Sequence, residues 1–82
     1  MNEIELRTQL KPLIAEMIEV DDFGDDENFV TSLGVDSMMA LEMVARIEKQ
    51  YRIRISEQYF PEMKTLNDIT RIIMEVMQPV EK

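Results

Sequence analysis

The chain has 82 residues, of which 45% are hydrophobic and 32% charged, with a net charge of −8 and neither cysteine nor histidine. This length and apolar content predict one folded domain, residues 1–82, with a modest core and no deep enclosed cleft. Disulfides, thiolate metal sites and histidine-based catalysis are excluded, and the acidic balance disfavours nucleic acid and anionic membranes as partners. The acidic N-terminus is not that of a signal peptide, and no apolar run approaches the roughly 20 residues of a membrane span, so we expect a cytoplasmic protein.

Apolar residues at helical spacing predict a first helix that ends near Glu19, namely Leu6, Leu10, Leu13, Ile14 and Met17. Pro12 lies inside this helix, so we expect a kink there or a helix that restarts at that point. Residues 20–35 form a long acidic connection. Its apolar residues are expected to pack it down against the core. These anchors are Phe23, Phe29, Val30 and Leu33.

Asp36 is predicted to cap a second helix over about residues 37–51. Its inward stripe is Ala40, Met43, Val44, Ile47 and Tyr51. The alternating segment 52–56 has no partner strand and is interpreted as a linker that buries Ile53 or Ile55.

A short third helix is expected after Ser56, ending at Pro61. Thr65 and Asp68 resemble a capping box that opens the last helix, which should fray at Pro79. The inward residues of that helix are Leu66, Ile69, Ile72, Ile73 and Val76. The fold class is therefore all-α, a small bundle of three main helices plus one short helix, with a long loop between the first two.

Ser37, directly after Asp36, is poorly equipped to be a catalytic nucleophile because the chain offers no histidine and no nearby lysine as its base. The acidic loop also fails the EF-hand pattern, whether the count starts at Asp21 or at Asp22. Only weak, nonspecific binding of divalent cations would remain there, so no metal site is predicted. Ser37 at the first turn of a helix is then either an ordinary residue or a site acted upon by another protein, where a phosphate ester would gain from free backbone N–H groups.

The segment LGVDSMMALEMVARIEKQY, residues 33–51, closely resembles the attachment segment of acyl and peptidyl carrier proteins. The matching residues are Leu33, Gly34, Val35, Asp36, Ser37, Met38 and Glu42. The similarity extends over nearly the whole chain, through Phe29 in the long loop, "ISE" before the short helix and "TLNDI" opening the last one.

This resemblance implies that a phosphopantetheinyl transferase attaches the 4'-phosphopantetheine of coenzyme A to Ser37, with Asp36 helping to bind the transferase's magnesium. The thiol of that arm would hold an acyl or aminoacyl group as a thioester, and the absence of cysteine fits an imported sulfur. The chain would then be no enzyme itself. It would act as a monomer with acyl-loading and acyl-processing enzymes that present basic docking faces.

Met38, Leu41, Glu42 and Ala45 lie at positions i, i+3, i+4 and i+7 and so share one face of the second helix. We predict that partner enzymes contact this face. The alternative is that Met38 and Leu41 complete a wide core stripe.

Carriers of primary fatty-acid synthesis are typically acidic along the second helix and the next loop, whereas this chain has Arg46, Lys49, Arg52 and Arg54 there. This difference favours a polyketide or nonribosomal-peptide pathway, with primary fatty-acid synthesis or an aminoacyl carrier as alternatives. A small acidic helical adaptor without a prosthetic group is the alternative from another class. The ends, Met1 and Lys82, lead us to expect a freestanding protein, with a domain excised from a larger synthase as the alternative.

Overall fold

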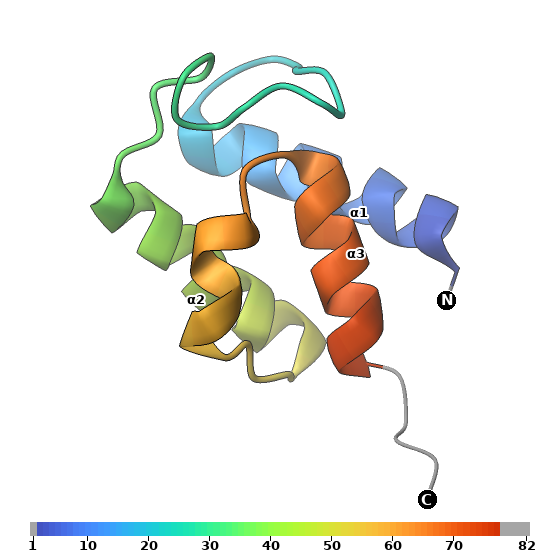
Figure 1. Cartoon of the computed structure of the whole chain (residues 1–82). Helices are drawn as coiled ribbons and strands as arrows, with labels where there is room; N and C mark the ends of the chain where they lie inside the picture. The colour runs from blue at the N-terminus through green and yellow to red at the C-terminus, as the bar shows by residue number, and fades with distance from the viewer. Residues whose placement is uncertain (1, 78–82) are drawn as a thin grey trace, which may run out of the picture.

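The computed structural model describes residues 2–77, which form four helical elements and no strand (Figure 1). In chain order these are α1 (Glu3–Ile18), α2 (Ser37–Tyr51), the 3-10 helix η1 (Glu57–Glu62) and α3 (Leu66–Met77). The all-α prediction, with its long loop between the first two helices, is confirmed. Within residues 2–77, no helix is long and apolar enough to cross a membrane.

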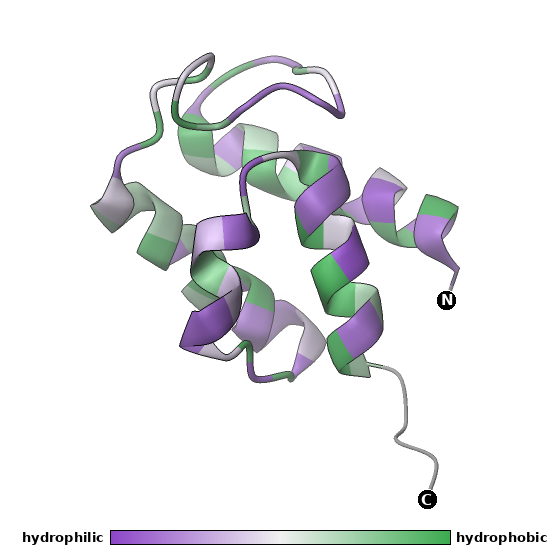
Figure 2. Cartoon of the chain, in the orientation of Figure 1, coloured by the Kyte–Doolittle hydropathy of each residue, from purple (hydrophilic) through white to green (hydrophobic). Residues whose placement is uncertain are grey.

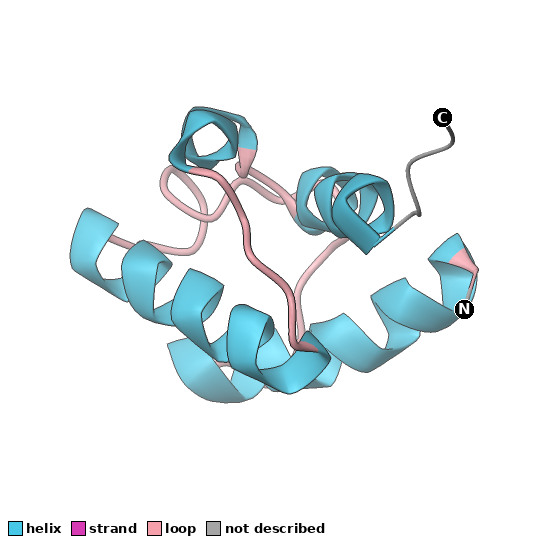
Figure 3. Ribbon diagram, turned by 90° about the horizontal axis from the view of Figure 1, so that it is seen from below, coloured by secondary structure: helices cyan, strands magenta, loops and turns pink. Residues whose placement is uncertain are grey.

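The helix α1 is the common packing partner of the fold, because it contacts both α3 and α2 and packs more extensively against α3. The view from below shows α3 and η1 on one side of α1 and α2 (Figure 3). In the view from below, η1 is separated from α2, so the overlap of these two elements in Figure 1 is one of projection.

The core is built from the apolar faces of the three long helices, which alternate with polar faces along each ribbon (Figure 2). All of the following are fully buried: Leu6, Leu10, Ile14, Ile47, Leu66 and Ile73. Each lies on the face that its helical spacing predicts, because burying a side chain of this size stabilises the fold by about 1.5–3 kcal/mol. Ala40, Tyr51 and Val76 were also expected in the core but are only partly buried.

Caps define both ends of α1. Asn2 and Glu5 form a capping box, in which the Asn2 side chain accepts from the Glu5 backbone N–H at 2.8 Å and the Glu5 carboxylate accepts from the Asn2 N–H at 3.2 Å. Glu19 ends the helix in the left-handed conformation. Between these caps α1 continues through Pro12 as one helix, so no restart occurs there. Buried Leu10 and Ile14, on either side of the proline, hold both halves against the core.

The loop 20–35 is packed down by aromatic residues, as predicted, but not by all four expected anchors. Phe23 and Phe29 are buried and meet edge to face at 5.8 Å between ring centroids. Leu33 is partly buried against the core. The prediction was wrong for Val30, whose side chain is 64% exposed, and the anchor in its place is Val35.

Backbone hydrogen bonds explain that difference. The Phe29 N–H donates to the Lys64 carbonyl at 2.8 Å, and the Val35 N–H donates to the Phe29 carbonyl at 2.8 Å. The first bond ties Phe29 to the segment before α3 and the second ties Val35 to Phe29, whereas Val30 remains exposed. In the part of the chain that the structure describes, the acidic residues form no group that could hold a metal ion.

The second half of the fold follows the sequence closely. Ile55 is the buried residue of the linker, and its N–H donates to the Glu48 carboxylate at 2.8 Å. The short helix does not stop at Pro61 but continues to Glu62 as a 3-10 helix, which the Met63 N–H closes by donating to the Phe60 carbonyl at 3.1 Å. The capping box of Thr65 and Asp68 is confirmed by reciprocal bonds of 3.1 and 3.2 Å. The predicted fraying at Pro79 lies outside the described residues.

Candidate functional site

The N-terminus of α2 presents Ser37 at the surface. Gly34 takes a positive φ of 71°, a conformation that favours glycine, and the chain then buries Val35. Asp36 caps the helix, since its Oδ1 accepts a hydrogen bond from the Met39 N–H at 2.8 Å. Ser37 is the first residue of α2 and is exposed. The predicted cap and helix start are confirmed, and the serine is held by a rigid element rather than by a loose loop.

The hydroxyl of Ser37 differs from most others in residues 2–77 because it makes no hydrogen bond within them. The hydroxyls of Thr8 and Thr70 donate to backbone carbonyls one turn earlier, at 2.8 Å each. Those of Ser56 and Thr65 accept from backbone N–H groups as helix caps. Among the described residues, the hydroxyls of Thr31 and Ser32 are the only others without a hydrogen bond, and neither residue begins a helix.

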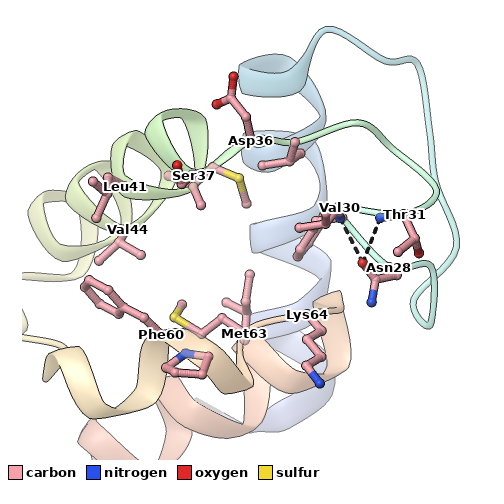
Figure 4. A pocket seen from close by; sticks show the side chains of 16 residues that line it. Asn28, Val30, Thr31, Asp36, Ser37, Leu41, Val44, Phe60, Met63 and Lys64 are labelled. Atoms are coloured by element: carbon pink, nitrogen blue, oxygen red, sulfur yellow. Dashed lines mark hydrogen bonds between the residues drawn. The ribbon is translucent and has the colours of Figure 1, made fainter.

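A pocket of about 780 Å³ opens beside Ser37, between α2, η1 and the end of the long loop (Figure 4). Its walls are mostly apolar. They include Val30, Leu41, Val44, Phe60 and Met63, together with Phe29, Val35, Ala40, Met43, Pro61 and Ile69. Ser37 and Asp36 line its mouth on the α2 side. The length of the chain led us to expect no deep enclosed cleft, and it did not predict a hollow of this size.

The pocket exists because η1 covers α2 incompletely. No residue of η1 is fully buried, and Tyr59 and Phe60 are only partly buried against the core. On the opposite rim the Asn28 side chain accepts from the N–H groups of Val30 and Thr31, at 2.8 and 3.0 Å, which fixes the loop in a tight turn (Figure 4). A short helix after a linker was visible in the sequence, but its loose packing was not.

The predicted partner face of α2 lies at the surface. Met38 is 72% exposed and Leu41 54% exposed, and Glu42 and Ala45 are exposed as well. The alternative in which Met38 and Leu41 complete the core stripe is therefore wrong. The buried face of α2 consists of Met43, Val44 and Ile47. Two large apolar side chains thus stand in solvent within one turn of Ser37.

Comparison with known proteins identifies the family to which the chain belongs. A family model described as the phosphopantetheine attachment site matches residues 8–73. The chain belongs to this family of carrier proteins. The 4'-phosphopantetheine group is the cofactor of the family, so the chain is a carrier that works with a modifying transferase and with biosynthetic enzymes.

Two relatives place the chain among acyl carrier proteins. It is 30% identical over 79 residues to the acyl carrier protein of Streptomyces coelicolor, a match that covers 93% of this chain and 86% of the relative. It is 42% identical over 53 residues to the polyketide-8 synthase acyl carrier protein 2 of Streptomyces avermitilis, which covers 62% of this chain and 61% of that relative.

Solved carrier structures share the fold at lower identity. BlmI, a type-II acyl carrier protein from Streptomyces verticillus involved in bleomycin biosynthesis, superimposes with a TM-score of 0.82 at 22% identity, over 93% of this chain and 90% of BlmI. A mupirocin didomain acyl carrier protein gives a TM-score of 0.78 at 22% identity, over 99% of this chain and 45% of the didomain. At these identities the likeness establishes the helical carrier fold.

Proposed function

We propose that Ser37 carries the 4'-phosphopantetheine arm and that this arm holds acyl intermediates for partner enzymes. The observation that supports this most directly is a free, exposed hydroxyl on the first residue of α2, at the mouth of an apolar pocket. The other hydroxyls at helix starts, those of Ser56 and Thr65, are engaged in capping.

The attachment needs a hydroxyl that a second protein can reach. The Ser37 oxygen forms the new bond to the phosphorus that bears the pantetheine arm. The phosphoanhydride bond between that phosphorus and the phosphate on the adenosine side of coenzyme A breaks, and adenosine 3',5'-bisphosphate leaves. The hydroxyl proton is proposed to leave to a base on the transferase, because this chain has no histidine and no lysine near Ser37 in sequence, and the neighbouring Asp36 carboxylate is assigned to capping and magnesium. We infer on the same grounds that the chain has no catalytic activity of its own.

Asp36 has two roles in this proposal. One carboxylate oxygen, Oδ1, caps α2 through the Met39 N–H. The second oxygen makes no hydrogen bond among the described residues and is free to contact the transferase's magnesium, since carboxylate oxygens are preferred ligands of that ion.

Partner enzymes are proposed to read the face formed by Met38, Leu41, Glu42 and Ala45. Exposed methionine and leucine beside the attachment point supply adaptable apolar contact for several partners in turn. Glu42 adds a charge contact to a basic partner, which acts mainly on the encounter rate. The carrier is proposed to work as a cytoplasmic monomer.

The pathway is proposed to be of the polyketide or nonribosomal-peptide type. Arg46, Lys49, Arg52 and Arg54 support this because all four are exposed where carriers of primary fatty-acid synthesis are typically acidic. The name of the Streptomyces avermitilis relative points the same way. Fatty-acid or aminoacyl carriage are the competing assignments, and the choice of acyl or aminoacyl group loaded by the enzymes encoded beside this chain separates the three.

The attachment is tested by intact mass after incubation with a phosphopantetheinyl transferase and coenzyme A. The wild-type protein should gain the mass of one phosphopantetheine, and Ser37→Ala should gain none while its helical signal is unchanged. Ser32→Ala is the matched control, because Ser32 is also exposed and its hydroxyl makes no hydrogen bond among the described residues, but it precedes the helix. Mass gain in Ser37→Ala would refute the assignment. No gain in the wild-type protein would favour an adaptor without a prosthetic group.

A further inference from the structure

The C-terminal half of α2 and the linker that follows carry a cluster of cations without ion pairs. Arg46, Lys49, Arg52 and Arg54 are all exposed, and none makes a salt bridge or side-chain hydrogen bond within residues 2–77. We call these four residues the basic end of α2. They stand out because the chain has a net charge of −8 and carboxylates are plentiful elsewhere.

The cations on the other long helices are paired. Arg7 contacts Glu3 at 2.9 Å, Lys11 contacts Asp25 at 3.3 Å, and Arg71 contacts Asp68 at 3.2 Å. At the basic end of α2, the nearby carboxylates form no ion pairs with the cations in the described structure. Glu42 lies one turn before Arg46 but makes no ion pair within residues 2–77, and the Glu48 carboxylate accepts from the Ile55 N–H.

The helix dipole explains only part of this cluster. A cation in the last turn of a helix interacts favourably with the C-terminal carbonyls, which accounts for Lys49. Arg46 lies before the last turn and Arg54 lies beyond the helix, where that effect has fallen off.

The basic end is continuous with the partner face near Ser37. Lys49 lies eleven residues after Met38, which places it about 20° around the helix from that residue. A shallow depression of about 360 Å³ joins Met17 of α1 to the α2 residues Glu42, Ala45, Arg46 and Lys49. Lys49 is about 18 Å along the helix axis from Ser37. A standard docking footprint of about 800 Å² per partner, on the order of 30 Å across, covers both.

We propose that the partner enzymes dock on α2 with a mixed face, in which acidic side chains meet Arg46, Lys49 and Arg52. A wholly basic docking face would set like charges opposite these cations, which costs affinity and slows encounter. The unpaired cations instead attract carboxylates and fix the direction in which the partner lies along α2. This inference rests on the proposed carrier function and refines the expectation of purely basic docking faces.

The test uses the holo carrier and an acyl-loading enzyme that accepts it as a substrate. Arg46→Glu and Lys49→Glu should each raise the KM of that enzyme for the carrier about threefold to tenfold, with kcat little changed, because rim charges act on encounter. Arg71→Glu, which makes the same change of net charge on α3, should leave KM within about twofold of the wild-type value. Exchanging the facing acidic residue of the enzyme for lysine should restore the KM of Lys49→Glu.

Unchanged KM values in both α2 variants, or an equal rise in the Arg71→Glu control, would overturn the proposal. Lys49→Gln checks the direction of the effect, since neutralising the charge should raise KM less than reversing it. Phosphatidylglycerol vesicles form a separate arm, and binding to them that Lys49→Glu abolishes would assign the basic end to a membrane instead. Failure of the docking proposal is distinguished from failure of the carrier function by the intact mass of each variant after the transferase reaction. If the carrier function fails, even the wild-type protein stays unmodified.

Discussion

At the scale of single residues, Asp36 combines two functions that one substitution can separate. Asparagine caps a helix about as well as aspartate, because its side-chain oxygen accepts the same backbone N–H, but it carries no charge. Asp36→Asn should therefore keep the hydrogen bond to the Met39 N–H and the stability of α2, while losing the proposed contact with magnesium.

We expect the melting temperature of Asp36→Asn to stay within a degree or two of the wild-type value, and the magnesium concentration needed for half-maximal transferase activity to rise. Asp36→Ala is the companion variant. It loses the cap as well and should be destabilised by about 1 kcal/mol. Equal magnesium requirements in wild type and Asp36→Asn would show that the second carboxylate oxygen has no part in the reaction.

The roles of single residues were predictable where one local interaction decides them. Asp36 and Thr65 were identified as caps because the pattern of a small polar residue before an apolar helix reflects a bond to a neighbouring N–H. Val30 and Val35 could not be distinguished in the same way. Both are valines in one loop. The burial of Val35 accompanies its own bond to the Phe29 carbonyl and the long-range bond from the Phe29 N–H to the Lys64 carbonyl, which the local pattern does not reveal.

At the scale of the element, α2 has a core face and a partner face. A glutamate introduced on the core face should lower the free energy of unfolding, whereas one on the partner face should not. Met38→Glu changes a side chain that is 72% exposed, so its free energy of unfolding should stay within about 0.5 kcal/mol of the wild-type value. Met43→Glu places a carboxylate at a position only 3% exposed, where lack of a partner should cost at least about 3 kcal/mol.

Chemical denaturation measures the free energy of unfolding of each variant. Turnover by the transferase or a downstream enzyme measures whether partner enzymes still recognise it. Met38→Glu should fold normally but lose turnover, as expected for a contact residue. Normal turnover in a folded Met38→Glu protein would remove Met38 from the proposed partner face.

The elements were predictable because their periodicity and their stop signals agree. Leu6, Leu10 and Ile14 repeat at helical spacing, and all three are fully buried in α1. The 3-10 geometry of η1 was harder to predict, because a segment of six residues that contains Pro61 is too short for its periodicity to distinguish a 3-10 helix from an α-helix. The pocket beside Ser37 depends on how loosely η1 packs against α2, and the local pattern of either element does not determine that.

At the scale of the whole molecule, alkaline pH should weaken the fold through two tyrosines and a lysine. Burial raises the pKa of Tyr51, and the hydrogen bond to the Glu75 carboxylate, 2.9 Å long, raises the pKa of Tyr59. The bond from Lys11 to Asp25 raises the pKa of Lys11. A folded-state pKa above the unfolded value contributes stability that is complete at lower pH and is lost as the pH rises through the folded pKa.

The free energy of unfolding should therefore fall as the pH rises above about 10, where these groups begin to titrate in the unfolded chain. Tyr59→Phe keeps the ring of Tyr59 but removes its ionisable hydroxyl. Urea denaturation of both proteins between pH 8 and 11 should show a shallower alkaline decline for the variant. Parallel declines would mean that the bond between Tyr59 and Glu75 does not persist in solution.

The charge of the long loop is the remaining whole-molecule property, and Lys11 determines how it responds to salt. The Lys11 ammonium lies 3.5 Å from the Asp22 carboxylate and 3.3 Å from that of Asp25, and its nitrogen is 5.7 Å from the centre of the Phe23 ring. It thereby fastens the loop to α1 and offsets part of the repulsion among the loop carboxylates.

Added salt screens both the attraction to Lys11 and the repulsion within a chain of net charge −8, and the repulsion involves more charges, so the wild-type melting temperature should rise with salt. Lys11→Gln removes the attraction and leaves the repulsion. Its melting temperature should be lower than that of the wild type at low ionic strength and should rise more steeply as salt is added.

Lys49→Gln removes the same charge from a side chain without an ion pair in the described structure, so its melting curve should follow that of the wild type. Thermal melts of all three proteins from about 10 mM to 1 M salt span the range over which screening shortens from about 30 Å to 3 Å. If Lys11→Gln and Lys49→Gln behave alike, total charge sets the stability and the contacts of Lys11 with the loop do not.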